Sequence, residues 1–241
     1  MKKPIIIQGA LQSEINFLLE KLENKTEIHE GNFVFYEGTY RDYPIVISKT
    51  KMGEISSAIS TTLSIKKYNP LFIINQGTAG ALVDWLNIGD IVIGNEFYYL
   101  SQYSTDCMKE VEDINPWKKS GYKTIDNEFV SYNANEKFLD CLKNLEFLKS
   151  KNVYFGSIGS GDIWTKEVET MHKNHENYGV LCEAMEVSGA YIAANSLDVP
   201  LVSIRVIANN EITHQEYDEK YGIITQEYTL NILDELIKLI K

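Results

Sequence analysis

The chain has 241 residues and a formal net charge of −11. A general nucleic-acid binder needs a basic face that displaces counterions, so this charge argues against that class and leaves small anionic or neutral ligands open. The length suits one large α/β unit, and we expect residues 1–241 to form a single domain with a substantial core.

The three cysteines show no metal-ligand spacing. Cys107, Cys141 and Cys182 form no CxxC pair, and their odd number gives no disulfide framework. The apolar stretch before Gln8 is too short for a signal peptide, and no later run is long enough to span a bilayer. We therefore expect a cytoplasmic protein that associates with no membrane and holds no metal or organic cofactor.

In chain order, apolar runs that suit buried strands alternate with segments of helical periodicity. Strand patterns occupy residues 4–9, 70–82, 89–99, 153–164 and 199–210, and helical patterns occupy 15–22, 54–68, 135–148, 184–197 and 225–240. Continuous apolar strands that alternate with helices predict a largely parallel sheet covered on both faces. We interpret the polar, Tyr- and Lys-rich segment Ser101–Asn135 as a long loop or insertion.

Ligands of such sheets bind at the carboxyl ends of the strands. One strand end, Asn75–Leu82 (NQGTAGAL), has small residues that let the backbone approach a ligand, and its N–H groups can hold hydroxyls or an anion. It matches neither the dinucleotide-binding nor the Walker motif. A tight structural turn is the alternative interpretation.

Three carboxylates are candidate site residues, and each has a structural alternative. Glu14 follows Ser13 at an expected helix start, where an acid can simply complement the helix dipole. Glu183 and Glu186 lie three residues apart among small residues, which predicts one face of a helix with one carboxylate in a pocket. A solvated helix start is the alternative, and it suits Glu183 better than Glu186.

The last expected strand carries an arginine inside an apolar run and ends on asparagines. Strand alternation places Arg205 and Asn209 on one side. A buried guanidinium is costly unless a carboxylate meets it, and Glu186 is the nearest candidate in sequence, with a structural ion pair as the alternative. Trp164 follows another strand end, where it can stack on a planar ligand or belong to the core.

Together and in this order, these motifs resemble the purine nucleoside phosphorylase and 5'-methylthioadenosine/S-adenosylhomocysteine nucleosidase superfamily. The resemblance covers nearly the whole chain and is weakest across Ser101–Asn135. The matching stretches are Gly9–Glu14 (GALQSE), Asn75–Leu82, Gly89–Val92 (GDIV), Ser160–Trp164 (SGDIW), Glu183–Glu186 (EAME), Val199–Leu201 (VPL) and Arg205–Asn209 (RVIAN). The resemblance implies a three-layer α/β/α sandwich around a central mixed, largely parallel sheet. It also implies a homodimer, a purine nucleoside as small-molecule partner, no nucleic-acid partner and no cofactor.

The resemblance further implies roles at the sugar end of a nucleoside site. Glu14 would orient and deprotonate the attacking water. Glu186 would accept hydrogen bonds from the ribose hydroxyls, with Met185 under the sugar. Arg205 and Thr78 would line the region of the sugar and the nucleophile.

At the base end, the resemblance implies that Trp164 stacks on the purine and that the backbone of Thr165 reads the purine edge. Ala79 and Gly80, from the small-residue loop, would also contact the substrate. Each of these assignments depends on the matching motif and is an expectation for this chain.

Asn209 departs from the pattern, because the nucleosidases carry at this position an aspartate that protonates purine N7. An asparagine can only hydrogen-bond. The trimeric purine nucleoside phosphorylases, which prefer 6-oxopurines, also use an asparagine there. Asn209 therefore shifts the base preference toward hypoxanthine-like purines, or slows an adenine-type reaction, or leaves the acid role to Glu211 or His214.

The resemblance favours hydrolysis of 5'-methylthioadenosine and S-adenosylhomocysteine-type nucleosides, a reaction of methionine salvage. Phosphorolysis would need an anion site, usually with arginines, but Gly9–Glu14 contains an acid, which repels phosphate and suits water. Two alternatives stay open. One is a nucleosidase or phosphorylase for inosine- or futalosine-like 6-oxopurine nucleosides, and the other is a catalytically weak nucleoside-binding protein on the same fold.

Overall fold

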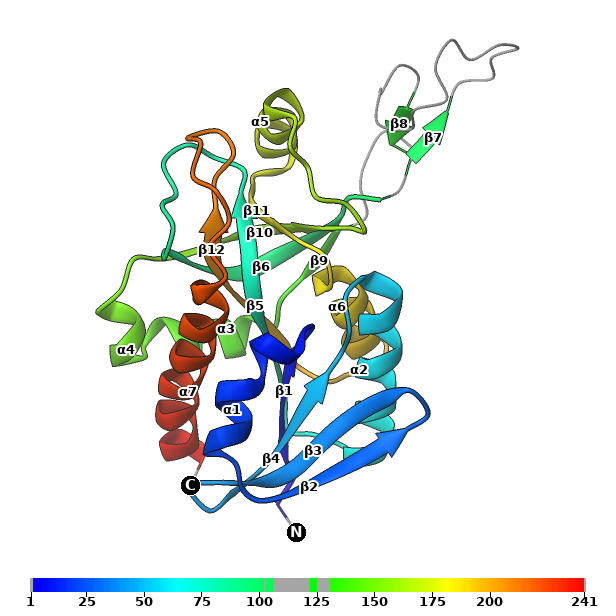
Figure 1. Ribbon diagram of the computed structural model, residues 1–241, viewed down its shortest axis with the longest axis vertical. Coiled ribbons are helices and arrows are strands. Elements are labelled where there is room, and N and C mark those ends of the chain that lie inside the picture. Colours follow the sequence, from blue (N-terminus) through cyan, green and yellow to red (C-terminus); the bar gives the residue numbers. More distant parts are fainter. Residues whose placement is uncertain (1, 102, 106–121, 125–130, 241) are drawn as a thin grey trace.

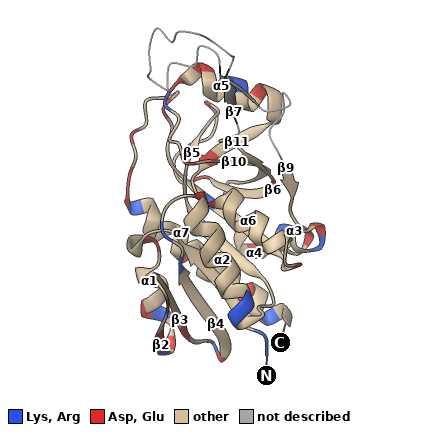
Figure 2. Ribbon diagram, turned by 90° about the vertical axis from the view of Figure 1, so that its right-hand side faces the viewer, with Lys and Arg blue, Asp and Glu red and all other residues tan. Residues whose placement is uncertain are grey.

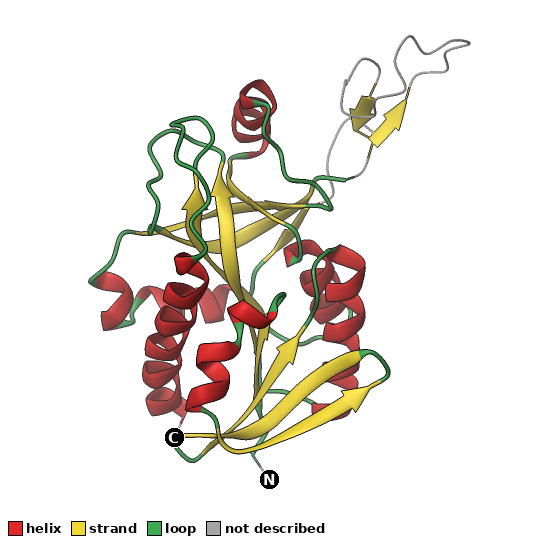
Figure 3. Cartoon of the chain, in the orientation of Figure 1, coloured by secondary structure: helices red, strands yellow, loops and turns green. Residues whose placement is uncertain are grey.

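A ten-stranded mixed sheet forms the centre of the protein, in a computed structural model that describes residues 2–101, 103–105, 122–124 and 131–240. Helices cover this sheet on both sides (Figures 1 and 3). The strands expected from the sequence are β1 (Ile5–Gly9), β5 (Ile73–Ala81), β6 (Ile91–Tyr99), β10 (Val153–Ser160) and β12 (Leu201–Asn209). The predicted three-layer α/β fold is confirmed.

The order of the strands brings distant segments of the chain together. It runs β11-β10-β6-β12-β5-β1-β4-β3-β2, where β11 is Val180–Ala184. β1, β5 and β12 pair in parallel, whereas β12 is antiparallel to β6. An additional antiparallel pairing joins β11 to β5, so the strands from β5 to β11 close on themselves. The ends of β5, β11 and β12 therefore meet at one place.

Two groups of helices flank the sheet. On one side lie α1 (Asn16–Lys21), α3 (Glu136–Lys143), α4 (Glu146–Lys149) and α7 (Lys220–Ile240), and on the other lie α2 (Glu54–Tyr68) and α6 (Val187–Asn195) (Figure 1). The small residues of α6 let it pack closely on α2, since a Cβ on Gly189 would collide with the backbone of Glu54. The remaining helix, α5 (Val168–Tyr178), lies at the same end of the molecule as the pocket described below.

Some elements were not expected from the sequence. They are β2 (Glu23–Glu30), β3 (Phe33–Tyr40), β4 (Tyr43–Lys49), β11 and α5. β2 is an edge strand whose residues are mostly polar and exposed, so it lacks the apolar run that marks the central strands. β3 and β4 join through a two-residue turn at Arg41 and Asp42, both with positive φ, and neither is the glycine that usually signals such a hairpin.

The segment Ser101–Asn135 is only partly covered by the described residues. These residues form β7 (Tyr103–Thr105) and β8 (Tyr122–Thr124), which pair with each other, and β9 (Ser131–Asn133), which pairs with β6. These three strands fit the insertion rather than the long loop, the two interpretations that the sequence left open. The rest of the segment, including Cys107, lies outside the described residues.

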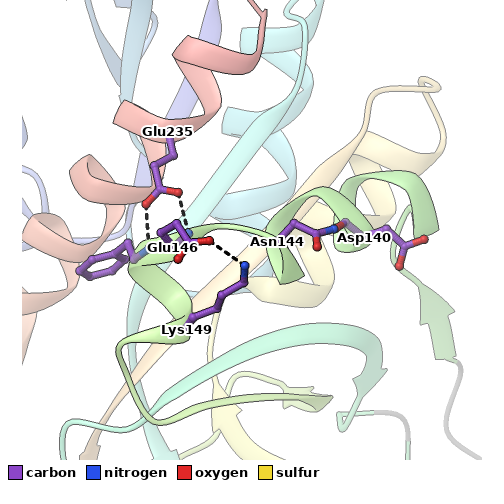
Figure 4. A network of polar contacts seen from close by, with 6 residues as sticks. Asp140, Asn144, Glu146, Lys149 and Glu235 are labelled. Carbon is purple, nitrogen blue, oxygen red and sulfur yellow. Dashed lines mark hydrogen bonds and ion pairs between the residues drawn. The ribbon is translucent and has the colours of Figure 1, made fainter.

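A network of polar contacts attaches α4 to α7 (Figure 4). The carboxylate of Glu235 on α7 accepts hydrogen bonds from the backbone N–H groups of Glu146 (2.7 Å) and Phe147 (2.8 Å), which begin α4. These N–H groups have no partner within the helix, so the contact caps it. The ribbon in Figure 2 shows that most Lys, Arg, Asp and Glu positions lie on helices, turns and the edge strand β2.

Candidate active site

A pocket of about 840 Å³, including its open mouth, lies where β5, β11 and β12 end. Its walls contain nine of the ten site residues predicted from the sequence: Glu14, Thr78, Ala79, Gly80, Trp164, Thr165, Met185, Glu186 and Asn209. Arg205 does not line the pocket and lies behind it. Leu11, Met52, Met171 and Tyr217 also line the pocket and were not foreseen, because no periodicity or motif marks them.

Glu14 lies in a short 3-10 turn, Gln12–Glu14, between β1 and α1. One carboxylate oxygen, Oε2, accepts hydrogen bonds from the N–H groups of Ala10 (2.9 Å) and Leu11 (3.0 Å). The other oxygen, Oε1, would lie 3.2 Å from a Cβ on Gly77. Oε2 thus caps backbone N–H groups at the start of the helical turn, which is the structural interpretation of Glu14. Oε1 lies beside Gly77, which has no side chain.

Arg205 is buried on β12 and borders the same space. Its Nη1 lies 3.2 Å from the Cβ position of Gly77, and it donates to the backbone oxygens of Asn75 (3.3 Å) and Ile204 (3.2 Å). Its Nη2 donates to the side chain of Asn75. No carboxylate forms a contact ion pair with it among the described residues, so the predicted pairing with Glu186 is wrong.

The charge of Arg205 is nevertheless balanced at longer range. Burial lowers the pKa of the guanidinium, and the charges of Glu186 and Glu14 oppose that shift. The Nε of Arg205 is buried without a hydrogen-bond partner in the structure.

Glu186 precedes the first turn of α6, and its Oε1 accepts a hydrogen bond from the N–H of Gly53 (3.3 Å). Burial raises the pKa of Glu186 to about 7, with Arg205 opposing the shift and Glu14 adding to it. The carboxylate therefore prefers a partner that donates hydrogen bonds to it, such as a sugar hydroxyl.

Behind Glu186, a second carboxylate supports the start of α6. Glu54 is buried and accepts hydrogen bonds from the hydroxyl of Ser160 and the N–H of Gly189. The Ser160 oxygen in turn accepts from the N–H of Val187 (3.0 Å). Burial raises the pKa of Glu54 as well. Nothing in the sequence singles out this residue, because it begins an ordinary helical pattern.

Aromatic rings and an amide group line the part of the pocket that lies around Trp164, Tyr217 and Asn209. Trp164 is half-exposed, and its ring contacts Tyr217 edge-on with centroids 5.8 Å apart. This arrangement excludes the core-tryptophan alternative. Both rings line the pocket, so a planar ligand could stack on them.

Glu183 differs from its prediction. It lies on strand β11 rather than on a helix, it is buried, and it lines the pocket together with Glu186. Its carboxylate accepts from the N–H (2.8 Å) and the hydroxyl (2.9 Å) of Thr165. The predicted helix face and the solvated position are both wrong, because β11 continues the sheet up to Ala184. The Thr165 N–H, expected to read a purine edge, has a partner within the protein.

Asn209 ends β12 and projects over Gly80. Its amide nitrogen and oxygen each lie 3.2 Å from the Cβ position of Gly80, so any other residue at 80 would crowd this amide. Its Nδ2 donates at 3.5 Å to Glu211, which also lies 3.7 Å from Lys166. Glu211 and the exposed His214 are not among the lining residues, so neither faces the pocket as the alternative acid role would require.

No group of three or more metal-ligating side chains occurs in the described parts of the chain. Within the same residues, no helix is long and apolar enough to cross a membrane.

Comparison with known proteins assigns this chain to a family. The phosphorylase superfamily model matches residues 4–239. The chain belongs to that superfamily.

Relatives within the superfamily are nucleosidases. A 5'-methylthioadenosine/S-adenosylhomocysteine nucleosidase of Staphylococcus aureus (strain bovine RF122 / ET3-1) is 27% identical over 236 residues, which cover 95% of this chain and 99% of the relative. The Neisseria meningitidis nucleosidase of the same name, in complex with methylthio-immucillin-A, superposes with a TM-score of 0.78 at 22% identity, covering 96% and 98% of the two chains. A futalosine hydrolase mutant of Helicobacter pylori strain 26695 superposes with a TM-score of 0.80 at 22% identity, covering 97% and 99%. These structures share the fold of this superfamily member.

Proposed function

We propose that this phosphorylase-superfamily member hydrolyses the N-glycosidic bond of purine nucleosides. The observation that carries the proposal is Glu14 in the pocket wall, where backbone N–H groups hold Oε2 and leave Oε1 to accept from a water molecule, with Arg205 behind the wall. A water molecule held there would have an acceptor for its proton and a cation beside it. The substrates named for the relatives, 5'-methylthioadenosine and S-adenosylhomocysteine, are the first candidates, and they would give the protein a place in methionine salvage.

In this mechanism the water oxygen bonds to C1' of the sugar while the C1'–N9 bond breaks and its electron pair leaves with the purine. Glu14 takes the proton of the water, and general bases of this kind contribute about 10²- to 10⁴-fold. Glu186 accepts hydrogen bonds from ribose hydroxyls, which strengthen as positive charge spreads over the sugar. Trp164 stacks on the base, and Asn209 donates to it as negative charge accumulates.

The small number of arginines favours hydrolysis over phosphorolysis, because a phosphate site usually contains arginines. The whole sequence contains two arginines, Arg41 and Arg205. Arg41 pairs with Asp234 on α7 (2.6 Å), and Arg205 lies behind the pocket wall near Glu14. A phosphate ion in that space would meet the Glu14 carboxylate, which repels it.

A second candidate substrate class is supported by Asn209. An amide at this position can donate to O6 or N7 of a 6-oxopurine but cannot complete a proton transfer to adenine. Inosine- or futalosine-like nucleosides therefore remain candidates, and the fold match to futalosine hydrolase is compatible with them.

One experiment tests the reaction and its substrates together. Release of free base is followed with 5'-methylthioadenosine, S-adenosylhomocysteine, adenosine, inosine and futalosine, each with and without phosphate. Hydrolysis predicts free sugar and no need for phosphate. Strict dependence on phosphate with formation of ribose 1-phosphate would indicate a phosphorylase, and no turnover of any substrate would indicate a nucleoside-binding protein.

We also propose a homodimer. Leu11, Met52, Ile55 and Ile59 are exposed, at 45%, 57%, 71% and 45%, and they gather beside the pocket mouth and along α2. An apolar stripe of this kind is typical of a contact surface. Sedimentation should give a mass of two chains, and Ile55→Asp should reduce it to one. The ten-stranded sheet, with strands from Ile5 to Asn209, supports one domain across residues 1–241, and the cysteine spacing supports a cytoplasmic location.

A further inference from the structure

Two buried glutamines from distant parts of the chain hold the backbone that carries Glu14. Gln76 of β5 donates from its Nε2 to the backbone oxygen of Glu14 at 2.8 Å. Gln226 of α7 donates from its Nε2 to the backbone oxygen of Ser13, also at 2.8 Å. Both glutamine side chains are buried. The two peptide units that flank Glu14 are therefore each bound by an amide from outside the turn.

The amide of Gln226 uses both its donors and its acceptor oxygen. Its Nε2 donates to the oxygen of Gly222 (2.7 Å) as well as to Ser13, and its Oε1 accepts from the N–H groups of Phe17 (2.9 Å) and Leu18 (3.3 Å). These two N–H groups belong to the first turn of α1 and have no partner within that helix. α7 and α1 lie side by side (Figure 1), so Gln226 fixes the start of α1 and the turn before it against α7.

Gln76 reaches the Glu14 backbone because residue 9 is a glycine. A Cβ on Gly9 would lie 2.8 Å from Gln76 Nε2 and 2.7 Å from the side chain of Ile15, so any larger residue would displace one of them. The Oε1 of Gln76 is buried and has no hydrogen-bond partner among the described residues. A substitution that removes the amide therefore loses the bond to Glu14 but also removes a buried polar atom that costs free energy.

Packing does little to hold the turn itself. The segment Gln12–Glu14 contains no buried residue, and the first buried side chain after it is Ile15. A general base acts only at the correct distance from its proton, and a misplacement of about 1 Å can cost about 10²-fold in rate. The position of the Glu14 carboxylate follows from its backbone. Hydrogen bonds to that backbone are therefore the means by which the fold can fix the base.

We infer that Gln76 and Gln226 are positioning residues that hold the Glu14 carboxylate in place for its reaction with water. The inference rests on the proposed function for the role of Glu14. It adds that β5 and α7, rather than the turn's own packing, fix the base. Neither glutamine lines the pocket, so both act through Glu14 and not on the substrate.

Gln76→Met tests the inference, because methionine fills a similar volume and removes the bond to Glu14 together with the unpartnered oxygen. The kcat for a cleaved nucleoside should fall by about 10- to 100-fold, while KM changes by less than about twofold. In a Glu14→Gln background the same substitution should cause no further loss, because the base that it positions is already absent. Gln12→Met, exposed in the same turn, is the matched control and should keep kcat within about twofold of the wild type.

An unchanged kcat in Gln76→Met, or an equal loss in the wild-type and Glu14→Gln backgrounds, would overturn the inference. The second result would indicate a general structural role. Gln226→Glu provides an independent variant if Gln76→Met does not fold. It keeps an acceptor for the N–H groups of α1 and removes the donor to Ser13, and it should show the same split between kcat and KM.

Amide hydrogen exchange decides the inference without turnover. The N–H groups of Ala10 and Leu11 donate to Glu14 Oε2, so a loosened Glu14 should speed their exchange by about tenfold in Gln76→Met. The N–H of Leu139, bonded to Asn135 in α3, is the internal control and should exchange as in the wild type. Unchanged exchange at Ala10 and Leu11 would contradict the positioning role. Absence of turnover in the wild type would instead refute the proposed hydrolysis and leave the exchange result to decide the positioning.

Discussion

The two ends of the pocket, which we propose to hold the sugar and the base, are built in different ways. At the sugar end, Glu14, Glu186 and Arg205 are ionisable side chains, and each forms hydrogen bonds with backbone groups. At the base end, Trp164 and Tyr217 are partly exposed rings, and the polar groups come from side chains at the ends of strands. Fixed charges suit the chemical step, whereas stacking surfaces and edge groups suit recognition. Changes at the two ends should therefore have separable effects.

The largest effect is expected at the sugar end, from Glu14→Gln. The amide cannot accept the proton of the water, so kcat should fall by about 10²- to 10⁴-fold. Binding of a free purine base should change little, because Glu14 lies at the other end of the pocket. Steady-state kinetics and base calorimetry measure the two quantities. Near-normal turnover would leave Glu14 with only its capping contacts to Ala10 and Leu11.

Glu186→Gln should have a smaller and mixed effect, raising KM and lowering kcat together by roughly 10-fold each, since about 1–3 kcal/mol is lost with a charged hydrogen-bond acceptor. The wild type should also cleave 2'-deoxyribosides less well than ribosides, and the variant should discriminate less. Equal handling of both sugars by the wild type would contradict a close contact between this carboxylate and the ribose.

The raised pKa of Glu186, about 7 against an ordinary value of 4.5, predicts a pH dependence of stability. Between these values the folded protein holds a proton that the unfolded chain has lost. Stability therefore falls as pH rises from about 4.5 to about 7, by on the order of 1 to 3 kcal/mol, and levels off above. Denaturant unfolding across this range should show the slope in the wild type and a flatter profile in Glu186→Gln. An unchanged slope in the variant would mean that other groups cause the pH dependence of stability.

At the base end, Asn209→Asp should alter preference more than rate. An aspartate in place of the amide repels O6 when it is ionised, and when it is protonated it can pass its proton to N7 of adenine. Cleavage of 6-aminopurine nucleosides should improve relative to 6-oxopurine nucleosides by about tenfold. The ratio of kcat/KM for 5'-methylthioadenosine and 5'-methylthioinosine measures this. A ratio that does not move would mean that another group supplies the acid.

At both ends the sequence predicts the strands and the pocket but not the partners of the buried charged residues. The central strands and α2 follow from apolar runs and helical spacing, and the glycine-rich strand ends mark the pocket. The partners of Arg205 and Glu183 could not be predicted, because both depend on the sheet. Asn75 reaches Arg205 across the pairing of β5 with β12, and β11 places Glu183 against Thr165 only because it pairs with β10 and β5. Non-local strand pairing leaves no trace in local periodicity.

The smallest effect is expected far from both ends of the pocket, at the contact between α7 and α4. Glu235 accepts two backbone N–H bonds that begin α4, so Glu235→Ala removes a helix cap. Loss of a cap of this kind costs about 1 kcal/mol of folding free energy. Because α4 contributes no residue to the pocket wall, kcat/KM and the base preference should both stay at wild-type values. Lys149→Ala, which removes only the exposed pair with Glu146, is the matched control and should cost less than about 0.5 kcal/mol. Denaturant unfolding of the two variants provides the comparison, and a kinetic change in Glu235→Ala would show that the helical layer around α7 is coupled to the site.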